Sequence, residues 1–263
     1  MYNNFVDLDD VFPSPAKVEK NKLYTPLDFY GSVIPLSKSI RFKLGYFSSN
    51  AISTLASGFA QFIYNGGVIE LMINQFVSES DYKLLNSDID SHNGRVEFIE
   101  SKYLMDLEEL NEVLKECNSH FFNCLRYLIN HSKQIKILPV TCVDGELSHY
   151  KEAIFEDIDG NKIYSNGSGN FTKAGILDNG ESFIIHRSWK NDEDKQLIDH
   201  ESNSFDKIFN REAINEFIYL SPDKLIITIN SCGKDKELNE LLEDEATLRH
   251  KLIKRKKISE KQK

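Results

Sequence analysis

Five residues near the middle of the chain combine one imidazole, one ammonium, one hydroxyl, one amide and one carboxylate. In chain order they are His149, Lys151, Ser168, Asn170 and Glu181. A neutral imidazole can attack phosphorus and form a covalent phosphohistidine, which divides one difficult step into two easier ones. The ammonium, hydroxyl and amide can hold the non-bridging oxygens and stabilise the charge that develops there. The carboxylate can fix the tautomer and orientation of the imidazole, so this set suits attack on a phosphodiester without a metal ion.

The pattern around these residues predicts neighbouring strands. The run IFEDIDGNKIYSNGS predicts two strands joined by a hairpin turn at Asp159-Gly160. His149 and Lys151 would share one face of the first strand, because side chains two apart on a strand point the same way. The second strand would end at Gly167 and bring the hydroxyl and the amide beside them. The run ESFIIHR predicts a third strand, which begins at the carboxylate.

At these residues the sequence resembles the phospholipase D superfamily. Its motif combines His-x-Lys, an acidic residue five positions after the lysine, and a downstream Gly-Ser-x-Asn. More narrowly, the chain resembles prokaryotic phospholipase D-like nuclease domains of restriction endonucleases and of superfamily-2 helicase fusions. Those domains share the phrases GYFSS, FIYNGGVIELMIN and GSGNFTKAG, so the resemblance covers roughly residues 24–189. One position departs from the pattern: Glu156, followed by Asp157, stands where the superfamily usually has Asp.

The resemblance implies a fold and a reaction. The fold is α/β, with a phospholipase D-like mixed β-sheet flanked by helices on both faces and a single motif copy per chain. The reaction is metal-independent cleavage of DNA through a phosphohistidine, in prokaryotic restriction or anti-phage defence. In that reaction His149 is the nucleophile and Glu181 orients it. The phosphoryl oxygens are bound by Lys151, Ser168 and Asn170, and neither a cofactor nor a metal ion is expected.

One chain carries only half of such a site. The superfamily reaction needs two His-x-Lys motifs, one for the nucleophile and one for the general acid that protonates the leaving oxygen. A second His-x-Lys spelling, His131-Ser-Lys133, closes a long predicted helix and has no Gly-Ser-x-Asn after it. Basic residues there fit the helix dipole better than catalysis. We therefore expect a two-fold homodimer in which His149 from each subunit meets its copy across the axis.

Several interpretations stay open. The leading one is a nuclease acting on DNA, with RNA not excluded. The second is a dimerising and docking module of a helicase- or ATPase-containing defence complex, with weak or gated nuclease activity. A lipid phosphodiesterase is disfavoured by the acidic surface, by the absence of a signal peptide and by the lack of an exposed amphipathic apolar segment. Arg187, on the third predicted strand, could either bind phosphate or form a structural ion pair.

Composition limits the class of protein. The chain has 263 residues, 40% of them hydrophobic and 17 of them Phe, which is enough for a sizeable core. No apolar run approaches the ~20 residues of a membrane span, and MYNNFVDLDD does not resemble a signal peptide. We therefore expect a cytoplasmic protein without a membrane partner. The net charge of −9 argues against non-specific coating of nucleic acid.

The chain divides into three predicted segments. Residues 1–22 are polar with two prolines and predict a poorly ordered lead. Residues 23–210 alternate helical and strand patterns and form the nuclease domain. Residues 211–263 predict a strand and helix appendage with a basic tail. Within it, KLIITIN is expected to be a late strand and the charged run after it a helix.

Overall fold

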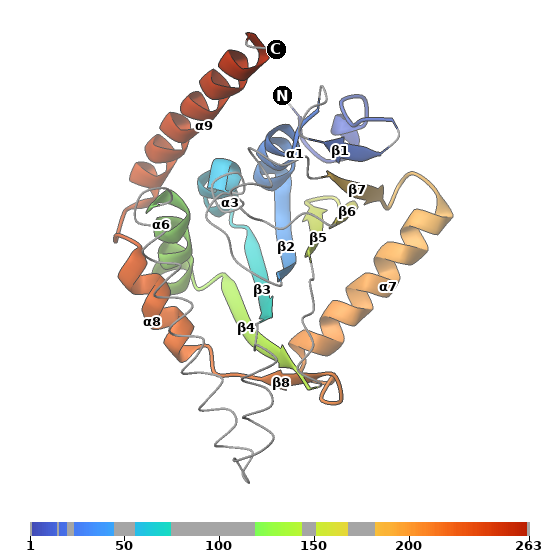
Figure 1. The fold of residues 1–263 in the computed structure, drawn as a ribbon, viewed down its shortest axis with the longest axis vertical. Coiled ribbons are helices and arrows are strands. Elements are labelled where there is room, and N and C mark those ends of the chain that lie inside the picture. Colours follow the sequence, from blue (N-terminus) through green and yellow to red (C-terminus); the bar gives the residue numbers. More distant parts are fainter. Residues whose placement is uncertain are drawn as a thin grey trace.

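The computed structural model describes residues 2–14, 16–19, 24–44, 56–74, 119–143, 151–167 and 182–261. Within these residues, eight strands form one mixed sheet in the order β1-β7-β6-β5-β2-β3-β4-β8 (Figure 1). Strands β2, β3 and β4 run parallel, and the other neighbouring pairs are antiparallel. The strands are β1 (Lys17–Glu19), β2 (Ser37–Leu44), β3 (Val68–Asn74), β4 (Ile135–Cys142), β5 (Lys151–Asp157), β6 (Lys162–Gly167), β7 (Ser182–Arg187) and β8 (Phe217–Tyr219).

Helices cover both faces of this sheet. A larger hydrophobic core, the first core, packs α1, α3, α6, α8 and α9 against one face. A smaller one, the second core, packs α7 against the other face, and Figure 1 shows α7 on the opposite side of the strands from α6, α8 and α9. The α/β fold with a mixed sheet between helices is thus confirmed. The helices are α1 (Pro26–Val33), α3 (Phe59–Tyr64), α6 (Ser119–Tyr127), α7 (Asp192–Phe209), α8 (Asp223–Cys232) and α9 (Leu238–Lys261), with short turns η1 (Val6–Leu8), η2 (Ile34–Leu36), η3 (Ala56–Gly58) and the π-helical η4 (Leu128–Ser132).

The central strands follow from their apolar patterns. Strand β3 reads VIELMIN without alternation, because both of its faces are covered: Leu71 belongs to the first core and Met72 to the second. The hairpin between β5 and β6 turns at Asp159-Gly160, as expected. Gly160 has φ +81°, a left-handed conformation that a residue with a Cβ adopts at a cost.

The N-terminal segment differs from the expectation of a poorly ordered lead. Phe5, Leu8, Phe12 and Val18 are buried in the first core. Strand β1 pairs with β7 at one end of the sheet. The segment is polar on average, but these four apolar side chains are buried. Their burial attaches the segment to the rest of the protein.

Asp9 ties the same segment to the residues after β7. Its carboxylate accepts hydrogen bonds from Arg187 Nη1 at 2.6 Å, from Trp189 Nε1 at 3.3 Å and from Lys190 Nζ. Burial raises the pKa of Asp9, but the hydrogen bond from Lys190 and the charges of Arg187 and Lys190 outweigh it and hold the pKa below its ordinary value of 3.8.

A group whose pKa is lower in the folded state contributes stability above its unfolded pKa and loses it as the pH falls through the folded value. We therefore expect the unfolding free energy of the wild type to fall below about pH 4 more steeply than that of Asp9→Asn, which is already less stable at pH 7. Urea titrations at several pH values would measure this. Asp10→Asn, at an exposed neighbouring position, is the control, and equal slopes for all three proteins would contradict the prediction.

The C-terminal segment completes the same sheet and core. Strand β8 pairs with β4, and α8 and α9 pack against α6 and α3. The expected strand KLIITIN is wrong, because these residues form helix α8. Leu225 and Ile229, four positions apart, are buried on one face of α8 in the first core, so packing against α6 overrides the β-propensity of the run.

None of the helices in the described ranges is both long and apolar enough to cross a membrane.

Candidate active site

Three strand ends that adjoin the predicted catalytic residues lie side by side at one edge of the sheet. Strand β5 begins at Lys151, β6 ends at Gly167, and β7 begins at Ser182. The register pairs Leu44, the last residue of β2, with Lys151, and pairs Gly167 with Phe183. The parallel strands β2, β3 and β4 end at this same edge, which is the lower one in Figure 1. We call it the motif edge.

The predicted site residues themselves are only partly within the described residues. His149, Ser168, Asn170 and Glu181 lie outside them. Lys151 is described as the first residue of β5 through its backbone pairing. The structure therefore brings together the strands from which the site residues continue, and the relation among the five side chains stays a prediction.

Two adjacent acidic residues, Glu156 and Asp157, follow Lys151 at the end of β5, and they have different environments. Asp157 is fully buried, and its carboxylate accepts hydrogen bonds from the backbone of Phe5, Asp159 and Asn161 at 2.8–3.0 Å. The side-chain amide of Asn161 donates a fourth. Glu156, by contrast, is half-buried and lies 4.0 Å from Lys162. The register of β2 against β5 shifts between these two positions, since Ser37 pairs with Asp157 and Ser39 pairs with Glu156. Of the two acidic residues, Asp157 is the one whose carboxylate is buried.

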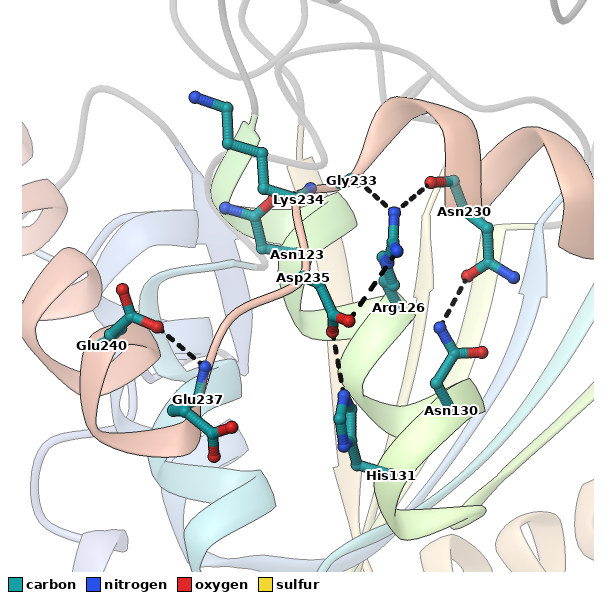
Figure 2. A network of polar contacts seen from close by, with 10 residues as sticks. All are labelled: Asn123, Arg126, Asn130, His131, Asn230, Gly233, Lys234, Asp235, Glu237 and Glu240. Atoms are coloured by element: carbon teal, nitrogen blue, oxygen red, sulfur yellow. Dashed lines mark hydrogen bonds and ion pairs between the residues drawn. The ribbon is translucent and has the colours of Figure 1, made fainter.

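The second His-x-Lys spelling serves a structural contact. His131 lies in η4 and its Nε2 is 2.9 Å from Asp235 Oδ1 (Figure 2). Its ring stacks on Tyr127. The hydrogen bond with His131 holds the pKa of Asp235 below its ordinary value. Lys133 follows as the left-handed residue that ends the helix, with φ 55°. This agrees with the interpretation of these residues as a helix terminus.

Figure 2 shows that the same network joins α6 to the connection between α8 and α9. Arg126 Nη1 donates to the carbonyl oxygens of Asn230 and Gly233 at 2.6 and 2.9 Å, and the side chain of Asn123 accepts from the backbone of Lys234. These carbonyls lie at the end of α8, where helices leave acceptors unpaired. The network therefore fixes the end of α8 on α6.

Arg187 also has a structural partner. Its guanidinium contacts Asp9 and lies 5.5 Å from the centre of the Phe12 ring. His186, one residue earlier, pairs through Nδ1 with Asp194 at 2.7 Å at the start of α7. Of the two interpretations for Arg187, the structural ion pair is the one observed.

A polar cluster on the α7 side of the sheet was not found from the sequence. Lys43 on β2 contacts Glu152 on β5 and Glu201 on α7. The phenol of Tyr164 on β6 accepts a hydrogen bond from Asn166 at 3.2 Å. Burial raises the pKa of Tyr164 well above its usual range, and the charges of Glu152 and Glu201 raise it further. The only sequence signal was a lysine between two apolar residues, Phe42 and Leu44, near the end of β2.

Among the described residues, no group of three or more His, Cys, Asp and Glu side chains is arranged to hold a metal ion. The carboxylates next to Lys43 are instead engaged by its ammonium group.

Comparisons with known proteins found similarities among solved structures. No family model and no curated protein matches the chain. It is similar to Nuc from Salmonella typhimurium, a phospholipase D family member, with a TM-score of 0.40 and 15% identity over 78% of this chain and 97% of that one. It is also similar to NucT from Helicobacter pylori, with a TM-score of 0.38 and 12% identity over 70% of this chain and 87% of that one.

Proposed function

We propose that this protein is a metal-independent phosphodiesterase that cleaves DNA through a phosphohistidine. One observation carries the proposal. The His-x-Lys block, the Gly-Ser-x-Asn block and Glu181 are separated in sequence. Each adjoins one of three strand ends, the start of β5, the end of β6 and the start of β7, which are neighbours at the motif edge. The hairpin between β5 and β6 sets the start of β5 beside the end of β6, and the antiparallel pairing of β7 with β6 adds the start of β7 to the same edge.

The proposed reaction uses these residues in two steps. His149 attacks phosphorus, a phosphorus–nitrogen bond forms, and the bond from phosphorus to the leaving oxygen breaks. His149 of the partner subunit gives its proton to that oxygen. Water then attacks the phosphohistidine, loses a proton to the same partner imidazole, and releases a phosphomonoester. The developing negative charge is stabilised by Lys151, Ser168 and Asn170, and Glu181 orients the nucleophile.

Completion of this site requires two chains. Each chain has one motif copy, and His131 is engaged by Asp235. We expect sedimentation to give a dimer whose dissociation on dilution abolishes activity, because a chain alone lacks the general acid. A monomer with full activity would contradict the two-chain site.

The direct test is DNA cleavage in excess EDTA by the wild type and by His149→Ala. Cleavage that survives EDTA and disappears in the variant supports the proposal. Equal cleavage by both proteins would overturn it. No cleavage by either would favour the docking module, with nuclease activity that depends on a helicase or ATPase subunit. The same assay with RNA decides whether the substrate is DNA or RNA. A role in prokaryotic restriction or anti-phage defence is supported by the sequence resemblance alone.

A further inference from the structure

A buried lysine lies one residue inside the motif edge. Lys43 is the penultimate residue of β2, and its side chain is 3% exposed. In the register of the sheet it faces Glu152 on β5, which in turn faces Asn166 on β6. This row of three side chains lies immediately inside Lys151 and Gly167, where β5 begins and β6 ends. It therefore crosses β2, β5 and β6, of which β5 and β6 adjoin the predicted motif residues.

Polar and aromatic groups surround the ammonium group of Lys43. It donates to Glu152 Oε2 at 3.1 Å and to Ser204 Oγ at 3.3 Å, and it lies 3.6 Å from Glu201 Oε2. It also lies 4.5 Å from the centre of the Phe205 ring. A charge removed from water needs such partners, because an unpaired buried charge is strongly unfavourable. These contacts fix the ammonium group between the sheet and α7.

We propose that Lys43 and Glu152 are positioning residues, whose buried ion pair holds the ends of β2, β5 and β6 in register at the motif edge. The catalytic consequence rests on the proposed function. Displacement of a reacting group by about 1 Å can lower the rate on the order of 100-fold. Since His149 lies only two residues before β5, a loosened start of this strand would change its approach to phosphorus.

A neighbouring ion pair on the same strand separates this role from general stabilisation. Arg41 is two residues before Lys43 and contacts Glu70 and Asp206, each at 3.0 Å. Like Lys43, it joins β2 to another strand and to α7. Its side chain is 28% exposed and it lies farther from the motif edge. Arg41→Met is therefore the matched control for Lys43→Met.

The experiment compares hydrogen exchange and kinetics in four proteins. They are the wild type, Lys43→Met, Arg41→Met and the double variant Lys43→Met with Glu152→Gln. The double variant keeps the test valid if Lys43→Met alone does not fold, because it does not leave Glu152 as an unpaired carboxylate. Exchange is followed in peptides that cover 151–157 and 162–167. The kinetic readout is kcat and KM for bis(p-nitrophenyl) phosphate in EDTA.

We expect exchange at the start of β5 to rise about tenfold or more in both Lys43 variants and to stay unchanged in Arg41→Met. We expect kcat to fall at least about tenfold in the same two proteins, with KM within about twofold of the wild-type value. Unchanged exchange at β5, or wild-type kcat despite increased exchange, would overturn the proposal. A wild type without hydrolytic activity would refute the proposed function, and exchange alone would then decide whether Lys43 holds these strands.

Discussion

Hydrolysis of bis(p-nitrophenyl) phosphate in EDTA is expected to fall roughly 10⁴-fold or more in kcat/KM when His149 is replaced by alanine. This loss corresponds to about 5.5 kcal/mol of transition-state stabilisation. The reason is that both steps of the proposed reaction need this imidazole, once as the nucleophile and once, in the partner subunit, as the acid and base. Steady-state kinetics on the purified protein would measure it.

The chain offers a matched control for this experiment. His131 has the same His-x-Lys spelling but pairs with Asp235 and stacks on Tyr127. His131→Ala should leave kcat/KM within about threefold of wild type, since the exposed ion pair contributes little to the fold. A loss of activity in His131→Ala equal to that in His149→Ala would show that the two motifs form one site, and would contradict the two-chain arrangement.

The largest expected effect on stability is that of Asp157→Ala. The variant leaves without partners the backbone N–H groups of Phe5, Asp159 and Asn161 and the Asn161 amide, all of which donate to Asp157. Each unsatisfied buried donor costs about 1–3 kcal/mol, and water at the hairpin offsets part of this cost, so we expect a loss of about 3–5 kcal/mol in unfolding free energy. Urea unfolding with an unchanged m-value would measure it.

Glu156→Ala is the control for Asp157→Ala. Glu156 is half-buried, and its contact with Lys162 is 4.0 Å long, so the expected change is within about 0.5 kcal/mol. Equal losses in the two variants would mean that the hairpin depends on net charge instead of on the buried hydrogen bonds.

The sequence was most informative where a local pattern and the tertiary environment agreed. The hairpin at Asp159-Gly160 needs a glycine with positive φ, and this requirement is local. Strand β3 carries buried apolar residues on both faces, a condition that its mostly apolar, non-alternating run VIELMIN reveals. The pattern around the motif residues predicted three strands, and β5, β6 and β7 are neighbours in the sheet.

The failures have a common physical cause, which is that the deciding contact is distant in sequence. Helix α8 forms because Leu225 and Ile229 pack on α6, although the run has strand-like composition. Lys43 is stabilised by Glu152 and Glu201, both more than a hundred positions away. Neither contact leaves a local signature, so a pattern taken over a short window could not reveal it.

The pairing of β1 with β7 has a consequence for synthesis on the ribosome. Val18 is paired with Phe183, so β1 must wait until the much later β7 has been made. At about 5–20 residues per second, this delay is roughly 10 s or more. Before β7 is made, the apolar side chains Phe5, Leu8 and Phe12 lack part of the core that buries them. After β7 is made, its edge stays unpaired until β1 binds to it. The pairing of β1 with β7 is thus a late event in folding. Because its contacts join residues far apart in the sequence, this pairing favours slow folding.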